Sequence, residues 1–487
     1  MLCYWHQQHR CNAQPNRLEA GGTTGKMPGR YTAWLFLKKL LIKAKRLMDE
    51  ILKPGQTIRC ELSGMTCTIE TLLGAGGQGE VYKAELGGEK VAVKWFFPNM
   101  ATPEQRASIE LLIRKGAPSE HFLYPLEITT APGVAGFGYV MPLRPPRFKN
   151  IVDLMTRRIE PTFRALATAS FNLAHNYLLL HSQGLCYRDI SFGNAFFDPD
   201  NGDILIADND NVSVDGAGVL GVLGTPRFMA PEVVRGEALP STQTDLFSLS
   251  VLIFYMLMVA HPLEGKRETE IKCLDLPAMT KLYGTDPLFI FDPSDNSNAP
   301  VPGVHDNALA FWRIYPQFLR DIFIRAFTVG LRDPLHGRVR ESEWRGTMVR
   351  LRDTIFYCAH CSLENFYDGE AIKASGGNPG LCWACAAALR LPPRIRIGKS
   401  VVMLNHDTEL FPHHIDDQRL YDFSAPVAAV AVNPANPNVW GLKNVSTGKW
   451  VITAAEGSIK DVEPGRSVTL AVGTRIQFGK MTGEIRT

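Results

Sequence analysis

The 487-residue sequence lacks any apolar run long enough to cross a membrane, and it lacks an excess of charge of one sign. Its 52 Lys and Arg residues nearly balance 49 Asp and Glu residues, and the net charge of +3 gives no argument for a nucleic-acid partner. A disulfide framework is also missing, because four of the ten cysteines form two CxxC pairs and the other six are scattered. This distribution suits a reducing compartment and a metal site, so we expect a cytoplasmic protein.

The composition is that of a globular protein, with 45% hydrophobic and 21% charged residues, and the length allows two to four domains. Motifs and shifts in composition divide the chain into an N-terminal arm, a large domain of two lobes, a small cysteine-containing module and a β-rich domain. The expected boundaries are 1–62 for the arm, 63–143 and 144–356 for the two lobes (63–356 together), 357–390 for the module and 391–487 for the last domain.

The arm begins with about 30 polar residues without periodicity, which we interpret as disordered, or as an over-long start before Met27 or Met48. Residues 31–52 have the pattern of a basic amphipathic helix. The pattern favours a solvated or partner-docked helix, and peripheral contact with an acidic membrane surface is the alternative.

The stretch CYRDISFGNAFFDPDNGDILIADND, from Cys186 to Asp210, contains the residues on which the functional prediction depends. Asp189 and Asn194 are five residues apart, and Asp208 follows a short hydrophobic run. Phosphoryl transfer from a nucleotide needs one carboxylate to orient the attacking hydroxyl, and oxygen ligands for Mg²⁺. The spacing predicts Asp189 as the catalytic carboxylate, and Asn194 and Asp208 as Mg²⁺ ligands.

A glycine-rich string, GAGGQGEVY, precedes this stretch, and Gly74, Gly76, Gly79 and Val81 fit the pattern G-x-G-x-x-G-x-V. Glycines let the backbone of a hairpin close over phosphates, because side chains there would block the approach. The strand VAVK ends fifteen residues later at Lys94, which can reach the phosphates of ATP.

These strings resemble the eukaryotic-type (Hanks-type) protein kinase family over about residues 65–355. The resemblance implies an α+β, bilobal kinase fold and an ATP- and Mg²⁺-dependent kinase acting on serine or threonine. It also implies that Glu110, on a helix starting at Pro103, pairs with Lys94, with Glu104 as the competing candidate. Met141 resembles the gatekeeper and Leu143 a hinge residue at the adenine of ATP.

The string GTPRFMAPE resembles the end of a kinase activation segment, with Glu232 closing the A-P-E motif. Thr225 fits the residue that contacts the substrate-binding loop in serine/threonine kinases. Asp245 resembles the aspartate that braces the catalytic-loop backbone. Either Arg338 or Arg340 fits the partner of Glu232, and Arg338 is preferred.

The sequence also departs from the family. Tyr187 replaces the histidine before the catalytic arginine, and Ser191 replaces the lysine that neutralises charge on the transferred phosphate. The D-F-G motif is Asp208-Asn209-Asp210, so the metal ligand is kept while the phenylalanine and the glycine are lost. The retained residues favour an active kinase, and the departures favour a pseudokinase scaffold that binds ATP and partner proteins. A small-molecule phosphotransferase is a third alternative.

Two CxxC pairs with twenty residues between them follow the kinase-like region. Four thiolates in two tight turns make a closed, tetrahedral Zn²⁺ site of the structural type, and in so small a module the metal replaces a hydrophobic core. We expect a four-cysteine zinc ribbon. Its ligands are Cys358, Cys361, Cys382 and Cys385.

From Leu391 onwards, short alternating runs separated by turn signals predict a β-sandwich. The strings RIGKS and WGLKNVSTGKW resemble parts of a forkhead-associated domain, a family that binds phosphothreonine peptides. The Ser-x-x-His pattern of that family is missing, and Pro412-His413-His414 is the nearest substitute. The C-terminal domain is therefore expected to be either a phosphopeptide-binding domain or a plain docking module.

The strings YRDISFGN and FIFDP, together with the two CxxC pairs, resemble a bacterial subgroup of these kinases that is linked to tellurium-resistance-type stress clusters. This resemblance implies a role in bacterial signalling or stress response. It also implies two candidate partners, a type 2C protein phosphatase and a von Willebrand A protein, besides the protein substrate.

Overall fold

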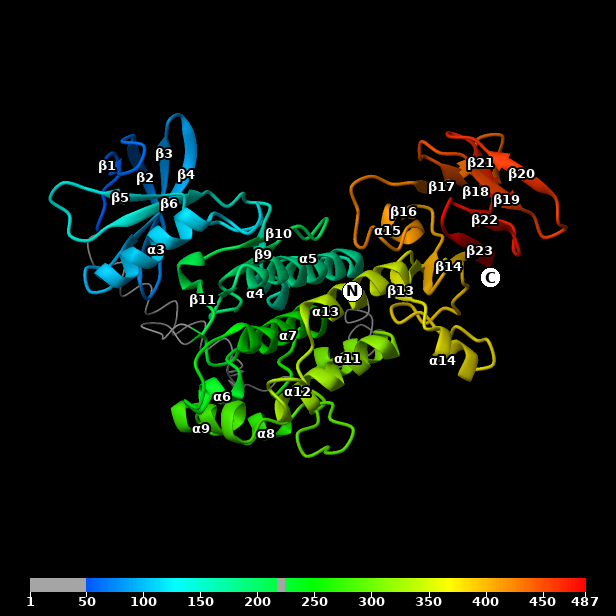
Figure 1. Cartoon of the computed structure of the whole chain (residues 1–487). Coiled ribbons are helices and arrows are strands. Elements are labelled where there is room, and N and C mark those ends of the chain that lie inside the picture. The colour runs from blue at the N-terminus through cyan, green and yellow to red at the C-terminus, as the bar shows by residue number, and fades with distance from the viewer. Residues whose placement is uncertain (1–49, 217–223) are drawn as a thin grey trace, which may run out of the picture.

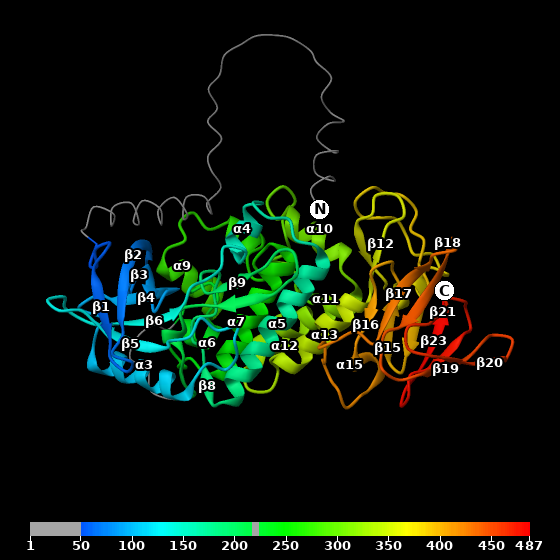
Figure 2. The ribbon, with the colours of Figure 1, turned by 90° about the horizontal axis from the view of Figure 1, so that it is seen from above.

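The computed structural model describes residues 50–216 and 224–487. Residues 1–49 of the predicted N-terminal arm, with most of the expected helix 31–52, lie outside the described residues. The expected boundary at residue 62 is wrong, because residues 57–60 form a strand of the first lobe. A barrel-shaped lobe lies at one end of the molecule and a β-rich domain at the other, with a helical lobe between them (Figures 1 and 2). No helix in the described ranges is long and apolar enough to cross a membrane.

The first lobe is a closed antiparallel barrel of six strands in the order β1-β2-β3-β4-β6-β5. Strand β1 and the first half of β2 alternate exposed and buried residues, whereas β4 and β6 are buried along most of their length. Large side chains such as Tyr82 and Trp95 fill the interior. One helix covers the barrel with its buried residues Ile109 and Leu112, and Thr102 caps its start. The elements are β1 (Thr57–Cys60), β2 (Thr66–Ala75), β3 (Gly79–Leu86), β4 (Glu89–Phe96), α3 (Pro103–Lys115), β5 (Glu127–Thr130) and β6 (Gly138–Pro142).

The helical lobe is built around α7 (Thr242–Met258), which is buried along nearly its whole length. Helix α5 (Phe163–Ser182) packs along α13 (Glu341–Asp353) and leads into the predicted catalytic loop. Short strands surround that loop: β7 (Lys149–Asn150), β8 (Leu185–Cys186), β9 (Ala195–Phe197), β10 (Ile204–Ile206) and β11 (Ser213–Val214). The other helices are α4 (Ile151–Met155), η1 (Asn209–Asn211), α6 (Pro231–Val234), α8 (Lys266–Thr269), α9 (Leu276–Thr280), η2 (Lys281–Thr285), α10 (Asp306–Ile314), α11 (Gln317–Phe327) and α12 (Val329–Arg332).

The four cysteines lie in a small unit that follows α13 directly. It contains the hairpin of β12 (Ile355–Tyr357) and β13 (Glu364–Phe366) and the short helix α14 (Gly369–Ala374).

The C-terminal domain has two antiparallel sheets, β15-β14-β23-β22-β19-β20 and β16-β17-β18-β21, which share one hydrophobic core. Residues from both sheets fill this core, among them Ile395, Leu442, Trp450 and Ile476. The elements are β14 (Arg394–Ile397), β15 (Ser400–Met403), β16 (Glu409–Leu410), α15 (Pro412–Ile415), β17 (Ala428–Asn433), β18 (Asn436–Asn444), β19 (Trp450–Thr453), β20 (Ile459–Val462), β21 (Ser467–Thr469), β22 (Arg475–Gln477) and β23 (Thr482–Arg486).

The C-terminal domain docks on α5 and α13. The ring of Phe171 on α5 lies 5.6 Å from that of Tyr421 and 5.5 Å from that of Phe423. The guanidinium of Arg345 on α13 lies 4.3 Å from the Tyr421 ring, and His414 Nε2 is 3.2 Å from Asp353 Oδ1. The docking surface therefore includes the helix that leads into the catalytic loop.

Candidate active site

Asp245, near the start of α7, fixes the backbone of the catalytic loop. Its carboxylate accepts the N–H of Tyr187 at 2.5 Å and the N–H of Arg188 at 3.2 Å. Arg188 has a φ of 69°, in the left-handed region, where a residue with a Cβ needs support from its surroundings. The two hydrogen bonds supply that support, and the expected bracing role of Asp245 is confirmed.

His181, in the last turn of α5, holds Asp245 from the other side. Its Nε2 lies 3.1 Å from Asp245 Oδ2, and its Nδ1 contacts the carboxylate of Glu341 on α13. Burial alone would lower the pKa of His181, but hydrogen bonds to Asp245 and Glu341 raise it to about 9. The imidazole is therefore positively charged at neutral pH and ties three helices to the catalytic loop. No local pattern in the sequence predicts this role, because the two partners of His181 lie 64 and 160 residues away along the chain.

The structure brings Asp189, Asn194 and Thr225 into direct contact. Asn194 Nδ2 donates to Asp189 Oδ2 at 3.0 Å, and Thr225 Oγ1 donates to Asp189 Oδ1 at 2.8 Å. The carbonyl of Asn194 accepts the N–H of Ala207 at 2.8 Å. The catalytic loop is thereby tied to the strand that ends immediately before Asp208.

Asp208 has φ 52° and ψ 44°, again in the left-handed region, and its side chain is 43% exposed. Burial by the surrounding protein raises the pKa of Asp208, and so do the negative charges of Asp210 and Asp189. The positive charge of Lys94 lowers this pKa. A cation bound there would favour the charged form. Asp208 is thus an accessible carboxylate next to Asp189 and Asn194, as a metal ligand needs to be.

Lys94 on β4 is almost completely buried and forms a bidentate ion pair with Asp210. Its Nζ lies 2.8 Å and 2.7 Å from the two carboxylate oxygens of Asp210, 3.7 Å from Asp208 Oδ1 and 3.1 Å from Gln78 Oε1. Burial alone would lower the pKa of Lys94, but the carboxylates of Asp210 and Asp208 raise it. The lysine is therefore charged and held beside the predicted metal ligand.

The expected pair between Lys94 and Glu110 is wrong. Glu110 on α3 instead forms an ion pair with Arg106, one helical turn earlier, with 3.1 Å between Arg106 Nε and Glu110 Oε1. Arg106 also binds Glu61, so this arginine draws the helix carboxylate towards the surface. The competing candidate Glu104 lies in the first turn of α3, as expected.

Asn209 occupies the position of the missing phenylalanine and is completely buried. Its Nδ2 donates to the carbonyls of Leu123 and Ile206, both at 2.9 Å. These two hydrogen bonds fasten the turn between Asp208 and Asp210 to the segment before β5 and to the end of β10. Two hydrogen bonds of a side-chain amide thus fix this turn, in place of the packing of a phenylalanine ring.

The predicted glycine-rich loop is the connection between β2 and β3. Gly74 and Gly76 border open space, since a Cβ on either would meet no atom within 4 Å. Gly79 differs, because a Cβ there would lie 2.1 Å from the carbonyl oxygen of Trp95 on the neighbouring strand β4. Val81 pairs with Lys94 across the two strands, so the loop and the lysine face the same region.

The expected adenine-side residues lie on or just after β6. Met141 pairs with Ala92 across β4 and β6 and is buried. Leu143 follows β6, and both Leu143 and Val81 are partly buried against the core that contains Met141. All three side chains therefore belong to, or pack against, the hydrophobic core that runs through both lobes.

Residues 67–301 match the family model of the protein kinase domain. They form a protein kinase domain. All the residues discussed above as a catalytic, nucleotide or magnesium site lie within this range. The four cysteines and the C-terminal sandwich lie outside it.

Relatives match the same region. The protein kinase C delta type of Mus musculus is 30% identical over 225 residues, which cover 44% of this chain and 32% of that protein. The serine/threonine-protein kinase drp72 of Corynebacterium efficiens is 25% identical over 224 residues, covering 43% of this chain and 42% of that protein. The chain thus spans about a third of the mouse relative's length, and the similarity concerns the kinase domain.

Within the helical lobe, Arg338 and Glu232 form a buried ion pair. Arg338 Nη2 lies 2.6 Å and 2.8 Å from the two Glu232 oxygens, and Arg338 Nη1 donates to the carbonyl of Gln243 at 2.6 Å. The preference for Arg338 over Arg340 is confirmed. The pair fixes the end of the activation segment to the start of α7.

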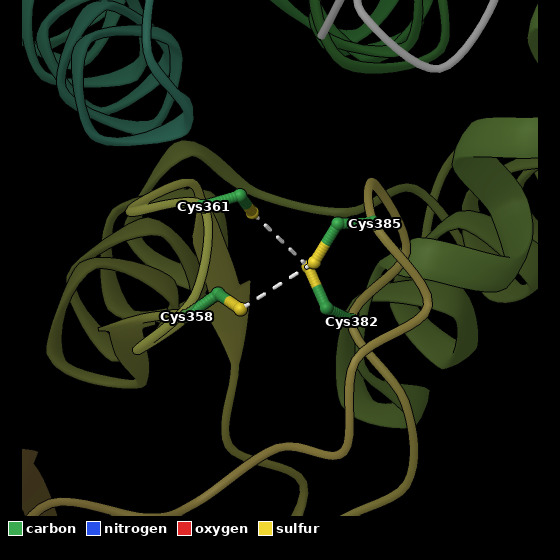
Figure 3. A group of neighbouring side chains, drawn as sticks. All are labelled: Cys358, Cys361, Cys382 and Cys385. Carbon is green, nitrogen blue, oxygen red and sulfur yellow. Dashed lines mark hydrogen bonds between the residues drawn. The ribbon is translucent and has the colours of Figure 1, made fainter. Parts of the chain in front are cut away.

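The thiols of the four clustered cysteines converge on one point (Figure 3). The Sγ atoms of Cys358 and Cys385 are 3.7 Å apart, as are those of Cys361 and Cys382, and all four lie within 4.8 Å of one another. A tetrahedron with Zn–S bonds of about 2.3 Å has S···S edges of about 3.8 Å. The cluster therefore fits a Zn²⁺ ion in size and in donor type.

The cysteine unit is joined to the start of α5. The Glu364 carboxylate accepts the N–H groups of Phe163 and Arg164, which are free donors at a helix N-terminus. The Phe163 ring packs against Phe366 at 5.0 Å and Trp383 at 5.8 Å. The two knuckles thus support the same helix that carries His181 at its other end.

Proposed function

We propose that this chain is an ATP- and Mg²⁺-dependent protein kinase that transfers phosphate to serine or threonine. The observation that supports the proposal most directly is the convergence of Asp189, Asn194, Asp208 and Lys94 in one site of a kinase domain. The names of several relatives, including the bacterial drp72, specify serine/threonine kinases.

In this proposal each residue has a separate task. Amides of the glycine-rich loop and the Lys94 ammonium bind the phosphates of ATP, and Asp189 orients the acceptor hydroxyl for in-line attack. Asn194 and Asp208 would hold Mg²⁺, which would neutralise charge on the phosphates. Ser191 carries no positive charge. In this proposal the Lys94 ammonium therefore helps Mg²⁺ to neutralise the charge on the phosphates.

A second candidate function is that of a pseudokinase scaffold. It is favoured by Ser191 and by the Asn209-Asp210 sequence, which leaves the turn after the metal ligand without glycine. In that case the pocket would bind ATP as a structural ligand and no phosphate would be transferred.

The experiment that separates the two candidates measures transfer of label from γ-labelled ATP, with Mg²⁺, to the protein itself and to a basic acceptor peptide. Asp189→Asn and Asp208→Asn should abolish transfer. Asp200→Asn is the matched control, because Asp200 is exposed and lies on the same segment away from the site. ATP binding without transfer in the unmodified protein would overturn the kinase proposal and leave the scaffold. Mapping the labelled residue tests serine or threonine against tyrosine.

We propose in addition that the four cysteines hold one structural Zn²⁺ and that the C-terminal sandwich is a docking module. The forkhead-associated resemblance gave Pro412-His413-His414 as the candidate phosphopeptide site. In the structure Pro412 and His414 are buried, and the His413 ring packs at 4.4 Å on Phe423. His414 also contacts Asp353 on α13, so this segment supports docking on the helical lobe rather than phosphopeptide capture.

The resemblance to bacterial stress kinases leads to a further proposal, a signalling role with a type 2C protein phosphatase and a von Willebrand A protein as partners. Co-purification of the full chain with each of these proteins tests it. A basic helix at residues 31–52 that binds anionic vesicles would add peripheral membrane contact.

A further inference from the structure

Lys94, the predicted phosphate-binding lysine, forms its ion pair with Asp210, a residue of the turn that follows the predicted metal ligand. The side chain of Asp210 is completely inaccessible, and that of Lys94 is 6% exposed. A buried ammonium group without a partner is costly, so its counter-ion determines where it rests. Here that counter-ion comes from the turn that follows the metal ligand, and not from α3.

Asp210 is itself fixed by a third contact. The Tyr139 hydroxyl on β6 donates to Asp210 Oδ1 at 2.9 Å, and Tyr139 lies directly opposite Lys94 in the pairing of β4 with β6. Lysine, carboxylate and phenol therefore form one closed group that bridges two barrel strands and the turn. The carboxylate oxygens have little freedom to turn towards another cation.

The backbone on both sides of Asp210 is held as well. Asn209 is latched to two carbonyls by its amide, as described above, and the carbonyl of Asn211 accepts a hydrogen bond from Arg188 Nε at 2.5 Å. The turn is thus connected to the catalytic loop on one side and to the barrel lobe on the other.

The carboxylate on α3 is engaged elsewhere. Glu110 is 41% exposed and paired with Arg106, whose second partner is Glu61 just after β1. Helix α3 does pack against η1, the turn that contains Asp210, so its link to Lys94 runs through this turn and not through Glu110.

We propose that Asp210, and not the α3 carboxylate Glu110, is the residue that positions Lys94 for the phosphates of the nucleotide. This inference rests on the proposed ATP site. The turn Asp208-Asn209-Asp210 then carries three functions in consecutive residues: a metal-binding carboxylate, an anchoring amide and a lysine-positioning carboxylate. Control of the lysine lies in this turn, since the described ion pairs of Lys94 go to Asp210 and Asp208.

The test is a double-mutant cycle on Lys94 and Asp210, with Glu110→Gln as the matched control. Calorimetry measures the affinity of the full chain for Mg²⁺ and a non-hydrolysable ATP analogue, so the result does not depend on phosphate transfer. Transfer assays then give kcat and KM for ATP separately. Asp210→Asn should weaken analogue binding and lower kcat/KM about 100-fold, as misplacement of a positioned group can. Glu110→Gln should stay within about 2-fold, because the Glu110 pair is exposed.

If Asp210 acts through Lys94, then Asp210→Asn should add almost nothing in a Lys94→Met background. A purely structural role of Asp210 would instead give additive losses. Asp210→Glu should restore part of the affinity and serves as the second variant if Asp210→Asn does not fold. A loss with Glu110→Gln as large as with Asp210→Asn, or additive losses in the cycle, would overturn the inference. Analogue binding that follows this pattern in a chain without transferase activity would refute the kinase proposal alone.

Discussion

The imidazole of His181 lies between the carboxylates of Asp245 and Glu341, with 3.1 Å between His181 Nε2 and Asp245 Oδ2. This contact connects the end of α5 to the residue that braces the catalytic loop. It also makes the stability of the site dependent on a proton.

The pKa of about 9 for His181 lies above the value near 6.5 of an unfolded histidine. A raised pKa contributes stability that is fully present below pH 6.5 and is lost as the pH rises through about 9. We expect the free energy of unfolding to fall by up to roughly 3 kcal/mol over this range. Urea unfolding between pH 6 and pH 10 measures this change. His181→Gln should remove most of the dependence, whereas His336→Gln, at a side chain that is 82% exposed, should not.

Two glycines of the nucleotide loop should respond differently to alanine. Gly79→Ala places a Cβ against the backbone of Trp95, where no flexible side chain can give way, so we expect a loss of several kcal/mol of stability or failure to fold. Gly76→Ala has open space around it and should leave the melting temperature unchanged while weakening ATP binding. Thermal melting and calorimetry check both. Equal melting temperatures for the two variants would contradict the prediction.

Removal of one partner from the buried Arg338–Glu232 pair should be strongly destabilising. Arg338→Ala leaves the Glu232 carboxylate, 12% exposed, without its cation, and we expect a loss of about 3–5 kcal/mol. Arg340→Ala is the control. Because Arg340 is exposed, its replacement should lower the free energy of unfolding much less. The double variant Arg338→Met with Glu232→Leu should recover part of the loss, and denaturant unfolding measures all four proteins.

Removal of the metal by a chelator should destabilise the kinase domain, although the cysteine unit contacts the end of α5 that is far from the catalytic loop. Elemental analysis should find one zinc per chain, and Cys358→Ser should reduce this value. Loss of the metal would release Glu364 and Trp383 from α5, so we expect a lower melting temperature and reduced phosphate transfer. Cys273→Ser, at an exposed cysteine outside the cluster, should change neither. Full activity after complete zinc removal would show that the cysteine unit is independent of the site.

Local spacing was enough to predict much of the candidate site. Asp189 and Asn194 come together because they lie on one short loop. The partner of Glu232 could be predicted because the sequence offers few arginines near Arg338. Helix α3 begins at Pro103 as expected, because proline suits the first helical position and Thr102 caps it.

The partner of Lys94 could not be predicted in the same way. Asp210 lies 116 residues from Lys94, and the choice between it and Glu110 depends on a surface arginine, Arg106, that captures the helix carboxylate. The sequence showed that the turn had lost its phenylalanine and glycine. It did not show that the substituted residues, Asn209 and Asp210, make new contacts of their own. Such contacts between distant elements depend on side-chain competition that spacing alone does not reveal.

The closed barrel has a consequence for how partners can reach this protein. Strand β1 pairs with both β2 and β5, so each of the six barrel strands has a neighbour on either side. A sheet without a free edge offers no template for strand addition, which is a common route to peptide capture and to aggregation. Recruitment through the first lobe therefore depends on side-chain surfaces, and the folded lobe is protected from edge-to-edge association.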